Sequence, residues 1–224
     1  VSKKVSKKEK QKLKSELNGE EILPNVLRCK FNGPIEFLPR YYDGIWWIQD
    51  AASQIPCNLL LTKIPKHFIN TKITSLKFLD LCSAPGGKAA QLLDNDLDIV
   101  CVEKNELRSK RFDENMKRLN FKSNIYIANA ENYDPGFKPD IVLIDAPCSA
   151  TGTIRRNPDI FIKPAPKNLD DLIKIQDNIL KNASKILNKN GIIMYITCSL
   201  QKIEGERRIE KFLIEQSNFS IIPF

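Results

Sequence analysis

Two cysteines, each placed just beyond an apolar run, are the residues of this sequence best suited to chemistry. Cys148 closely follows the run that ends at Asp145, and Cys198 closely follows a second run, about fifty residues later. A thiolate is a strong nucleophile, so two thiols in one site would support covalent catalysis. Strand ends of an open parallel sheet converge on one crevice, which brings residues that are far apart in sequence together. The sequence therefore predicts an active site with two cysteines.

The elements that must position these cysteines alternate between strands and helices. Short apolar runs predict strands, and helical spacing predicts helices between them, which is typical of an α/β fold with a doubly wound, mostly parallel sheet. Prolines interrupt residues 22–62, which are predicted to be irregular. The predicted strands cover residues 76–82, 98–103, 124–128, 140–145 and 191–197, and the predicted helices cover residues 87–94, 106–119, 168–187 and 202–216.

The first of these strands leads into a turn that carries a cofactor signal. Residues 80–88 read DLCSAPGGK, and the two glycines allow a ligand to approach the backbone where a helix begins. The turn lacks the early glycine and the Mg²⁺-binding hydroxyl of a P-loop, and it lacks the GxGxxG spacing of a dinucleotide site. Glu103 ends the next strand, where an acidic side chain commonly binds both ribose hydroxyls. A ribose carboxylate without a phosphate cradle favours S-adenosylmethionine.

The charge of the chain suggests a polyanionic partner. The 224 residues are enough for one sizeable domain and carry a formal net charge of +8. Residues 1–14 hold seven lysines against one glutamate, a net +6, so this tail dominates the charge. The tail is either a poorly ordered extension, a remnant of an upstream domain's last helix, or a contributor to nucleic-acid affinity. In the body, Arg155 and Arg156 are the preferred phosphate contacts.

The cysteine count indicates a reducing compartment with free thiols. None of the six cysteines forms a C-x-x-C pair and His67 is the only histidine, so no metal site of familiar spacing is expected. Cys82 and Cys101 lie in apolar runs and are expected to be buried. No segment has the length of a membrane span or the apolar stretch of a signal peptide, so a soluble, cytoplasmic protein is expected.

The motifs, in this order and spacing, resemble the Sun (Fmu) family of RNA cytosine-C5 methyltransferases. The upstream segment 46–53, WWIQDAAS, is similar to the stretch that leads into the catalytic domain of the family's bacterial 16S ribosomal-RNA members. The resemblance covers about residues 26–222 and implies a Rossmann-like class I S-adenosylmethionine-dependent methyltransferase. The motifs that carry it are residues 80–88, 145–152, 155–159 and 197–199.

The same resemblance implies a domain organisation. A basic extension, or the remnant of an upstream domain, is expected at residues 1–25. The catalytic domain is expected at residues 26–224, with a lead-in segment at 26–70 and a core at 71–224.

A covalent mechanism is also implied by the resemblance. Cytosine C5 is too weak a nucleophile to take a methyl group directly, so Cys198 is implied to add to C6 first. Cys148 is implied to assist the later release of the enzyme thiol by acid–base chemistry. Asp145 is implied to bind the cytosine edge, and Lys88 to supply positive charge near the substrate. The base must leave any stack, so the expected substrate is single-stranded, looped or flipped.

The cofactor contacts come from the resemblance in the same way. Asn129 stands where relatives usually have an aspartate near the adenine, and its amide can still accept a hydrogen bond. Ribosomal RNA is the favoured substrate, with transfer RNA as the alternative. The implied contacts of S-adenosylmethionine are Cys82, Ser83, Ala84, Pro85, Gly86, Gly87, Lys88, Glu103, Asn129 and Asp145.

Two departures from the family pattern bear on the partners of the chain. Residues 219–224 are followed by no second strand, so the C-terminal strand pair is expected to be incomplete. The N-terminal RNA-binding domain of the bacterial members is also expected to be missing, which suggests a fragment or a protein partner. Two other functions stay open: a non-catalytic RNA-binding remnant, and a DNA cytosine methyltransferase with Cys148 as nucleophile, against which Thr197 and Cys198 argue.

Overall fold

A parallel sheet forms the centre of the protein. The computed structural model describes residues 1–162 and 168–223, and its larger sheet has five strands in the order β5-β4-β3-β6-β7. All four strand pairs of this sheet are parallel, which confirms the predicted fold class. Each predicted strand is present with slightly shorter bounds: β3 Phe78–Asp80, β4 Ile99–Glu103, β5 Asn124–Ile127, β6 Ile141–Asp145 and β7 Ile192–Ile196.

The strand order creates the crevice that the sequence predicts. From β3 the chain moves outward to β4 and β5, and then crosses back to β6 and β7 on the other side of β3. The switch point therefore lies between β3 and β6, which pair in register from Phe78 with Ile141 to Asp80 with Leu143. Both strands are buried, as expected for a parallel sheet that is covered on both faces.

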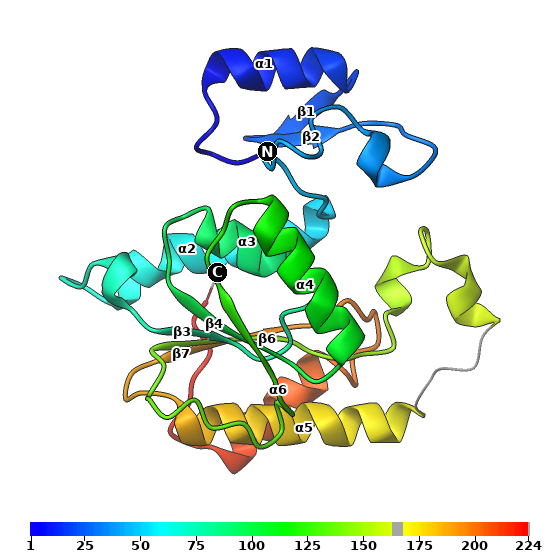
Figure 1. Cartoon of the computed structure of the whole chain (residues 1–224). Helices are drawn as coiled ribbons and strands as arrows, with labels where there is room; N and C mark the ends of the chain where they lie inside the picture. The colour runs from blue at the N-terminus through cyan, green and yellow to red at the C-terminus, as the bar shows by residue number, and fades with distance from the viewer. Residues whose placement is uncertain (163–167, 224) are drawn as a thin grey trace.

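Helices cover the two faces of the sheet (Figure 1). One face packs against α2 (Ala51–His67), α3 (Gly87–Leu93) and α4 (Glu106–Arg118), and the other against α5 (Leu169–Ile186) and α6 (Glu206–Glu215). The two faces have separate apolar clusters, with Phe112 and Met116 of α4 in the first and Ile179 and Leu180 of α5 in the second. The four helices that the sequence predicts are all present.

The prediction that residues 22–62 are irregular is wrong. Helix α2 begins after Asp50, whose side chain accepts a hydrogen bond from the Ala52 amide, and it contains Pro56 and Pro65. Proline cannot donate a helical hydrogen bond, and for this reason the sequence suggested a break. The burial of one face of α2 offsets that loss, because Cys57, Leu60 and Ile64 are almost completely buried in the first apolar cluster.

The N-terminal residues form a small unit at one end of the molecule. Helix α1 (Lys7–Glu16) lies over an antiparallel hairpin of β1 (Glu20–Leu23) and β2 (Val26–Arg28), at the top of Figure 1. Leu13 of α1 is fully buried, so residues 7–16 are a packed helix rather than a poorly ordered extension. The expected domain boundary between residues 25 and 26 falls in the hairpin turn.

The end of the chain adds no strand to the sheet within the described residues. Residues 219–223 have no regular structure, and β7 is the outer strand. Ile222 packs against the first apolar cluster, and the Lys63 ammonium donates a hydrogen bond of 2.6 Å to the Pro223 carbonyl. Phe224 and residues 163–167, which belong to the expected catalytic domain, lie outside the described residues. Across the described part, no helix is both long enough and apolar enough to span a membrane.

Candidate active site

The two cysteines singled out by the sequence meet at the carboxyl ends of β6 and β7. Their Sγ atoms lie 3.3 Å apart, with Cys148 half-buried and Cys198 exposed. The hydrogen bond between them lowers the pKa of Cys148 to about 6, whereas the same contact, burial and the Asp145 charge raise the pKa of Cys198. The pair therefore loses one proton readily and retains the other. The predicted convergence of the thiols is confirmed.

Lys88 and Asp145 form an ion pair next to the thiols. Lys88 is the second residue of α3 and Asp145 the last residue of β6, and their Nζ and Oδ2 atoms lie 2.6 Å apart. The Lys88 side chain is only 11% exposed and that of Asp145 is 38% exposed, so the ammonium is largely shielded from water while the carboxylate stays accessible. Asp145 stands three residues before Cys148 and acts on the pKa of Cys198, which connects the ion pair to the thiols.

A cavity of about 430 Å³ lies over the glycine turn. Gly86 precedes α3 with a φ of +102°, which L side chains rarely adopt, and a Cβ atom there would lie 2.9 Å from Cδ2 of Phe112, so the position requires glycine. Tyr41 and Ile48 of the lead-in segment also line the cavity. Eight of the ten expected cofactor contacts line it: Cys82, Ser83, Ala84, Pro85, Gly86, Gly87, Lys88 and Asp145.

The other two expected contacts, Glu103 and Asn129, do not line this cavity. Glu103 ends β4 and is 5% exposed; its Oε1 accepts a hydrogen bond of 2.9 Å from the Asn105 amide, and its Oε2 is buried without a hydrogen bond. This oxygen faces the Arg108 guanidinium and has no hydrogen-bond donor, so it can still accept a bond from a ribose hydroxyl. Arg108 connects the two regions, because its guanidinium lies 3.5 Å from Glu103 and donates to the Ala84 carbonyl. The Asn129 side-chain oxygen accepts from the Glu131 amide at 3.2 Å.

The sequence analysis missed two acidic residues of the cavity. Asp80 is 1% exposed, and burial together with the Asp145 charge raises its pKa to about 7. An acidic residue that ends a buried strand was the available signal for it. Asp50 also lines the cavity, and its Oδ2 lies 3.4 Å from Nε of Arg156, one of the two expected phosphate contacts. Arg155, the other, is exposed and does not line the cavity.

Three further cysteines have thiols that resist deprotonation, unlike Cys148. Burial raises the pKa of Cys57 and of Cys101 to about 12, and it also raises the pKa of Cys82. Cys101 is fully buried as expected, and Cys82 is half-buried. The described residues contain no group of three or more histidine, cysteine or acidic side chains placed to hold a metal ion.

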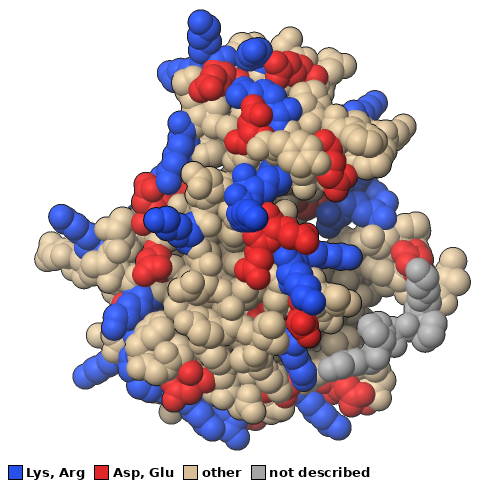
Figure 2. Space-filling view, viewed as in Figure 1, with Lys and Arg blue, Asp and Glu red and all other residues tan. Residues whose placement is uncertain are grey.

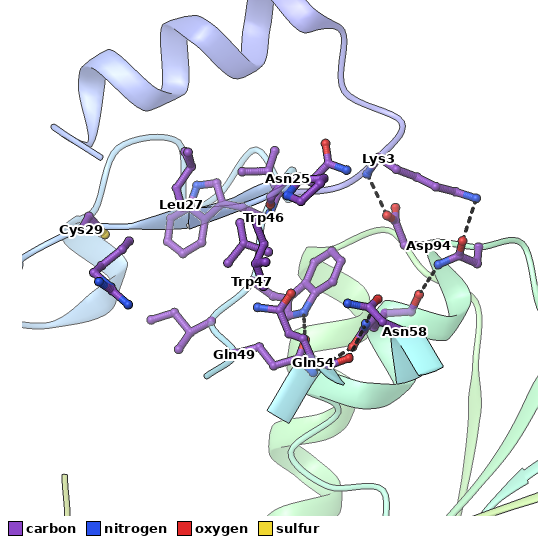
Figure 3. A pocket seen from close by; sticks show the side chains of 18 of the residues that line it. Lys3, Asn25, Leu27, Cys29, Trp46, Trp47, Gln49, Gln54, Asn58 and Asp94 are labelled. Carbon is purple, nitrogen blue, oxygen red and sulfur yellow. Dashed lines mark hydrogen bonds between the residues drawn. The ribbon is translucent and has the colours of Figure 1, made fainter. Parts of the chain in front are cut away.

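A second cavity, of about 650 Å³, separates the N-terminal unit from α2 and α3 (Figure 3). Its floor is a chain of amides, in which Gln49 donates to Gln91 at 3.0 Å and Gln91 donates to Asn58 at 2.7 Å. Trp46 and Trp47 stand between the hairpin and this floor. None of the expected cofactor or catalytic residues lines the cavity, so we assign it to the joint between the lead-in segment and the core.

Comparison with known proteins agrees with this arrangement. The family model of the 16S rRNA methyltransferase RsmB/F matches residues 71–224. Ribosomal RNA small subunit methyltransferase B of Photorhabdus laumondii is 34% identical over 200 residues, which cover 87% of this chain and 44% of that protein. The chain thus spans less than half the length of this curated relative.

Two solved structures from Pyrococcus horikoshii are also similar. A methyltransferase homolog protein has a TM-score of 0.72 at 26% identity, covering 99% of this chain and 70% of that one. NSun6, solved with SFG, has a TM-score of 0.69 at 26% identity, and the match covers 82% of this chain and 46% of that one. These matches confirm the resemblance drawn from the motifs. With the family model covering the entire core, the chain belongs to the RsmB/F family of 16S rRNA methyltransferases.

Proposed function

We propose that this protein transfers a methyl group from S-adenosylmethionine to C5 of a cytosine in RNA. The observation that carries the proposal is the thiol pair, 3.3 Å apart, beside the ion pair of Lys88 and Asp145. Ribosomal RNA is the favoured substrate, because the curated relative is a ribosomal RNA methyltransferase, and transfer RNA is the alternative. The cofactor assignment is supported by the Glu103 oxygen that has no hydrogen-bond donor and by the neighbouring structure that holds SFG, an S-adenosylmethionine analogue.

The chemistry needs a thiolate, and the pair provides one. The Cys198 sulfur attacks C6 of the cytosine, a C6–S bond forms, and the Cys198 proton passes to Cys148. Lys88 orients the Asp145 carboxyl, which binds the cytosine edge and stabilises a proton that N3 takes up from water, so that C6 becomes more electrophilic. When bound, S-adenosylmethionine supplies the electrophilic methyl group that C5 takes.

Release reverses the first step. The C5 proton is lost to water, the C6–S bond breaks, Cys148 returns its proton to the departing Cys198 sulfur, and the N3 proton returns to water. The pair is then ready for another cycle. Cys148 acts twice in this scheme, first as the acceptor and then as the donor of the same proton. Only the first role can be replaced, because without Cys148 the Cys198 thiolate still forms at higher pH.

A pH profile tests the shared proton. Because the pKa of Cys148 is lowered to about 6, the reactive pair is present above that pH and is lost as the pH falls through it. The rate at which wild-type protein forms an adduct with 5-fluorocytidine RNA should therefore rise with a midpoint near pH 6. In Cys148→Ala the midpoint should move up toward the ordinary thiol value of about 8.5. An unchanged midpoint in the variant would rule out the shared proton.

Glu103 is expected to set the affinity for the cofactor. Glu103→Gln keeps the size of the side chain but removes the charge that accepts ribose hydroxyls, so binding of S-adenosylmethionine should weaken roughly tenfold to a hundredfold. Isothermal calorimetry measures this change directly. The matched control is Glu106→Gln on the exposed start of α4, which should bind as the wild type does. Equal affinity for both variants would remove Glu103 from the cofactor site.

The lowered pKa of Cys148 favours one alternative assignment, in which Cys148 itself is the nucleophile, as in the DNA enzyme considered above. RNA and DNA oligonucleotides of one sequence separate the two substrates, since only RNA should be methylated. Basic side chains stand on the N-terminal unit and on the body of the face seen in Figure 2, with acidic side chains among them. We propose that some of these contact RNA phosphates, in a protein of the cytoplasm, where free thiols persist.

A further inference from the structure

A buried carboxylate underlies the two cysteine loops. Glu204 lies between β7 and α6, and it is fully buried. Its Oε1 accepts hydrogen bonds from the Ser149 amide at 2.9 Å and from the Gln176 side chain at 3.1 Å. Its Oε2 accepts from the Ser149 hydroxyl. Ser149, the residue after Cys148, is thus held through its backbone and its side chain at once.

The same network reaches the other side of Cys148 and the second loop. The Gln176 amide also donates to the Pro147 carbonyl at 2.9 Å, so both neighbours of Cys148 are tied to one point below it. The Ser149 and Ser199 hydroxyls lie 3.0 Å apart, which connects the Cys148 loop to the residue after Cys198. Backbone bonding completes the link, because Gly152 donates to the Cys198 carbonyl at 2.8 Å.

The charge of Glu204 fixes the direction of these bonds. Burial favours the neutral acid, but hydrogen bonds from the hydroxyls of Ser149 and Ser199, the Ser149 amide and Gln176 hold the pKa of Glu204 below its ordinary value. An ionised carboxylate can only accept, so the Ser149 amide and hydroxyl must both donate to it. Its backbone carbonyl is held as well, by the Tyr195 hydroxyl at 2.8 Å.

We propose that Glu204 is a positioning residue that holds the Cys148 loop where Cys148 can return a proton to the departing Cys198 sulfur. The inference rests on the proposed function, because it concerns the release step of that reaction. A displacement of about 1 Å between reacting groups can slow a step roughly a hundredfold. Release depends on the distance between the two sulfurs, whereas binding of the cofactor does not involve Glu204, which lies outside the cavity over the glycine turn.

The expected effect of Glu204→Gln follows from its donors. The new side chain has one acceptor oxygen and no charge. Its NH₂ group would either face the Ser149 amide, so that two donors meet, or donate to the Ser149 hydroxyl and reverse that bond, and in both cases the loop would be held less firmly and would shift. We expect turnover to fall about tenfold to a hundredfold. Cofactor affinity should be unchanged, and a covalent protein–RNA adduct should accumulate during turnover. The matched control is Glu206→Gln, an exposed carboxylate paired with Lys202 one helical turn away, which should behave as the wild type.

The experiment compares four proteins on denaturing gels with unmodified RNA and S-adenosylmethionine: wild type, Cys148→Ala, Glu204→Gln and Glu206→Gln. Adduct in both Cys148→Ala and Glu204→Gln supports the inference. If Cys148→Ala forms adduct but Glu204→Gln turns over slowly without adduct, the inference is overturned. Turnover of Glu204→Gln at the wild-type rate overturns it as well. The absence of adduct in Cys148→Ala would instead contradict the proposed function, so the two failures are distinguishable.

A second variant keeps the inference testable if Glu204→Gln does not fold. Ser149→Ala removes the hydroxyl that donates to Glu204, contacts Ser199 and accepts from the Gln201 side chain at 3.2 Å. It keeps the hydrogen bond from the backbone amide of residue 149 to Glu204. Adduct above the wild-type amount in Ser149→Ala supports the positioning role. Wild-type turnover without adduct in that variant overturns it.

Discussion

Cys198→Ala should abolish methyl transfer to RNA, with a loss of at least about a thousandfold in rate. The reason is chemical: without a sulfur bonded to C6, C5 of cytosine is not nucleophilic enough to take the methyl group. Cofactor binding should survive, because Cys198 does not line the cavity over the glycine turn. Incorporation of a radiolabelled methyl group into RNA measures the first effect, and calorimetry measures the second.

A cysteine away from this site provides the control for that variant. Cys29→Ala removes a thiol of the N-terminal unit that lies next to β2, and it should leave methyl transfer unchanged. Substantial activity in Cys198→Ala would exclude Cys198 as the nucleophile. The exposed position of Cys198 at the end of β7 would then have to be explained by something other than contact with a flipped base.

Cys148→Ala should have the opposite signature, an enzyme that starts the reaction and does not finish it. In the wild type the Cys148 sulfur lies 3.3 Å from the Cys198 sulfur. Without Cys148, the departing Cys198 sulfur receives no proton from this neighbour. We expect turnover to fall roughly a hundredfold or more and a covalent protein–RNA complex to persist through denaturation. An electrophoretic shift that disappears after ribonuclease treatment measures the complex.

The double variant is the control for this trap. Cys148→Ala combined with Cys198→Ala should form no complex, since the remaining cysteines are distant from the site or hold thiols whose pKa burial has raised. If instead Cys198→Ala forms the stable complex and Cys148→Ala forms none, the roles of the two cysteines are reversed. The lowered pKa of Cys148 would then mark the nucleophile itself.

The sheet and its crevice were predictable from the sequence because buried parallel strands read as short apolar runs with clear ends. The runs before Asp145 and Thr197 placed both cysteines at the same edge, and the glycine turn placed Lys88 there as well. The positions of the strand ends in the sequence were enough to predict this edge of the site, because the carboxyl ends of all strands in a parallel sheet lie on the same side.

Helix α2 and the role of Glu204 could not be obtained in the same way. Pro56 and Pro65 argue against a helix locally, and only the packing of Cys57, Leu60 and Ile64 against the core outweighs them. Glu204 resembles an ordinary solvated glutamate in the sequence. Its burial depends on Ser149, 55 positions earlier, and on Gln176 of α5, contacts that no local pattern encodes.

The most direct test of the account is mass spectrometry of the adduct between the wild-type protein and RNA that carries 5-fluorocytidine at the target position. Fluorine at C5 leaves no proton to lose, so the enzyme cannot complete release and the sulfur bond is retained. After digestion, the modified nucleotide should be found on the peptide that contains Cys198, with Cys148 free. A nucleotide on Cys148, or no covalent product with RNA that the protein binds and methylates when unmodified, would contradict the proposed mechanism.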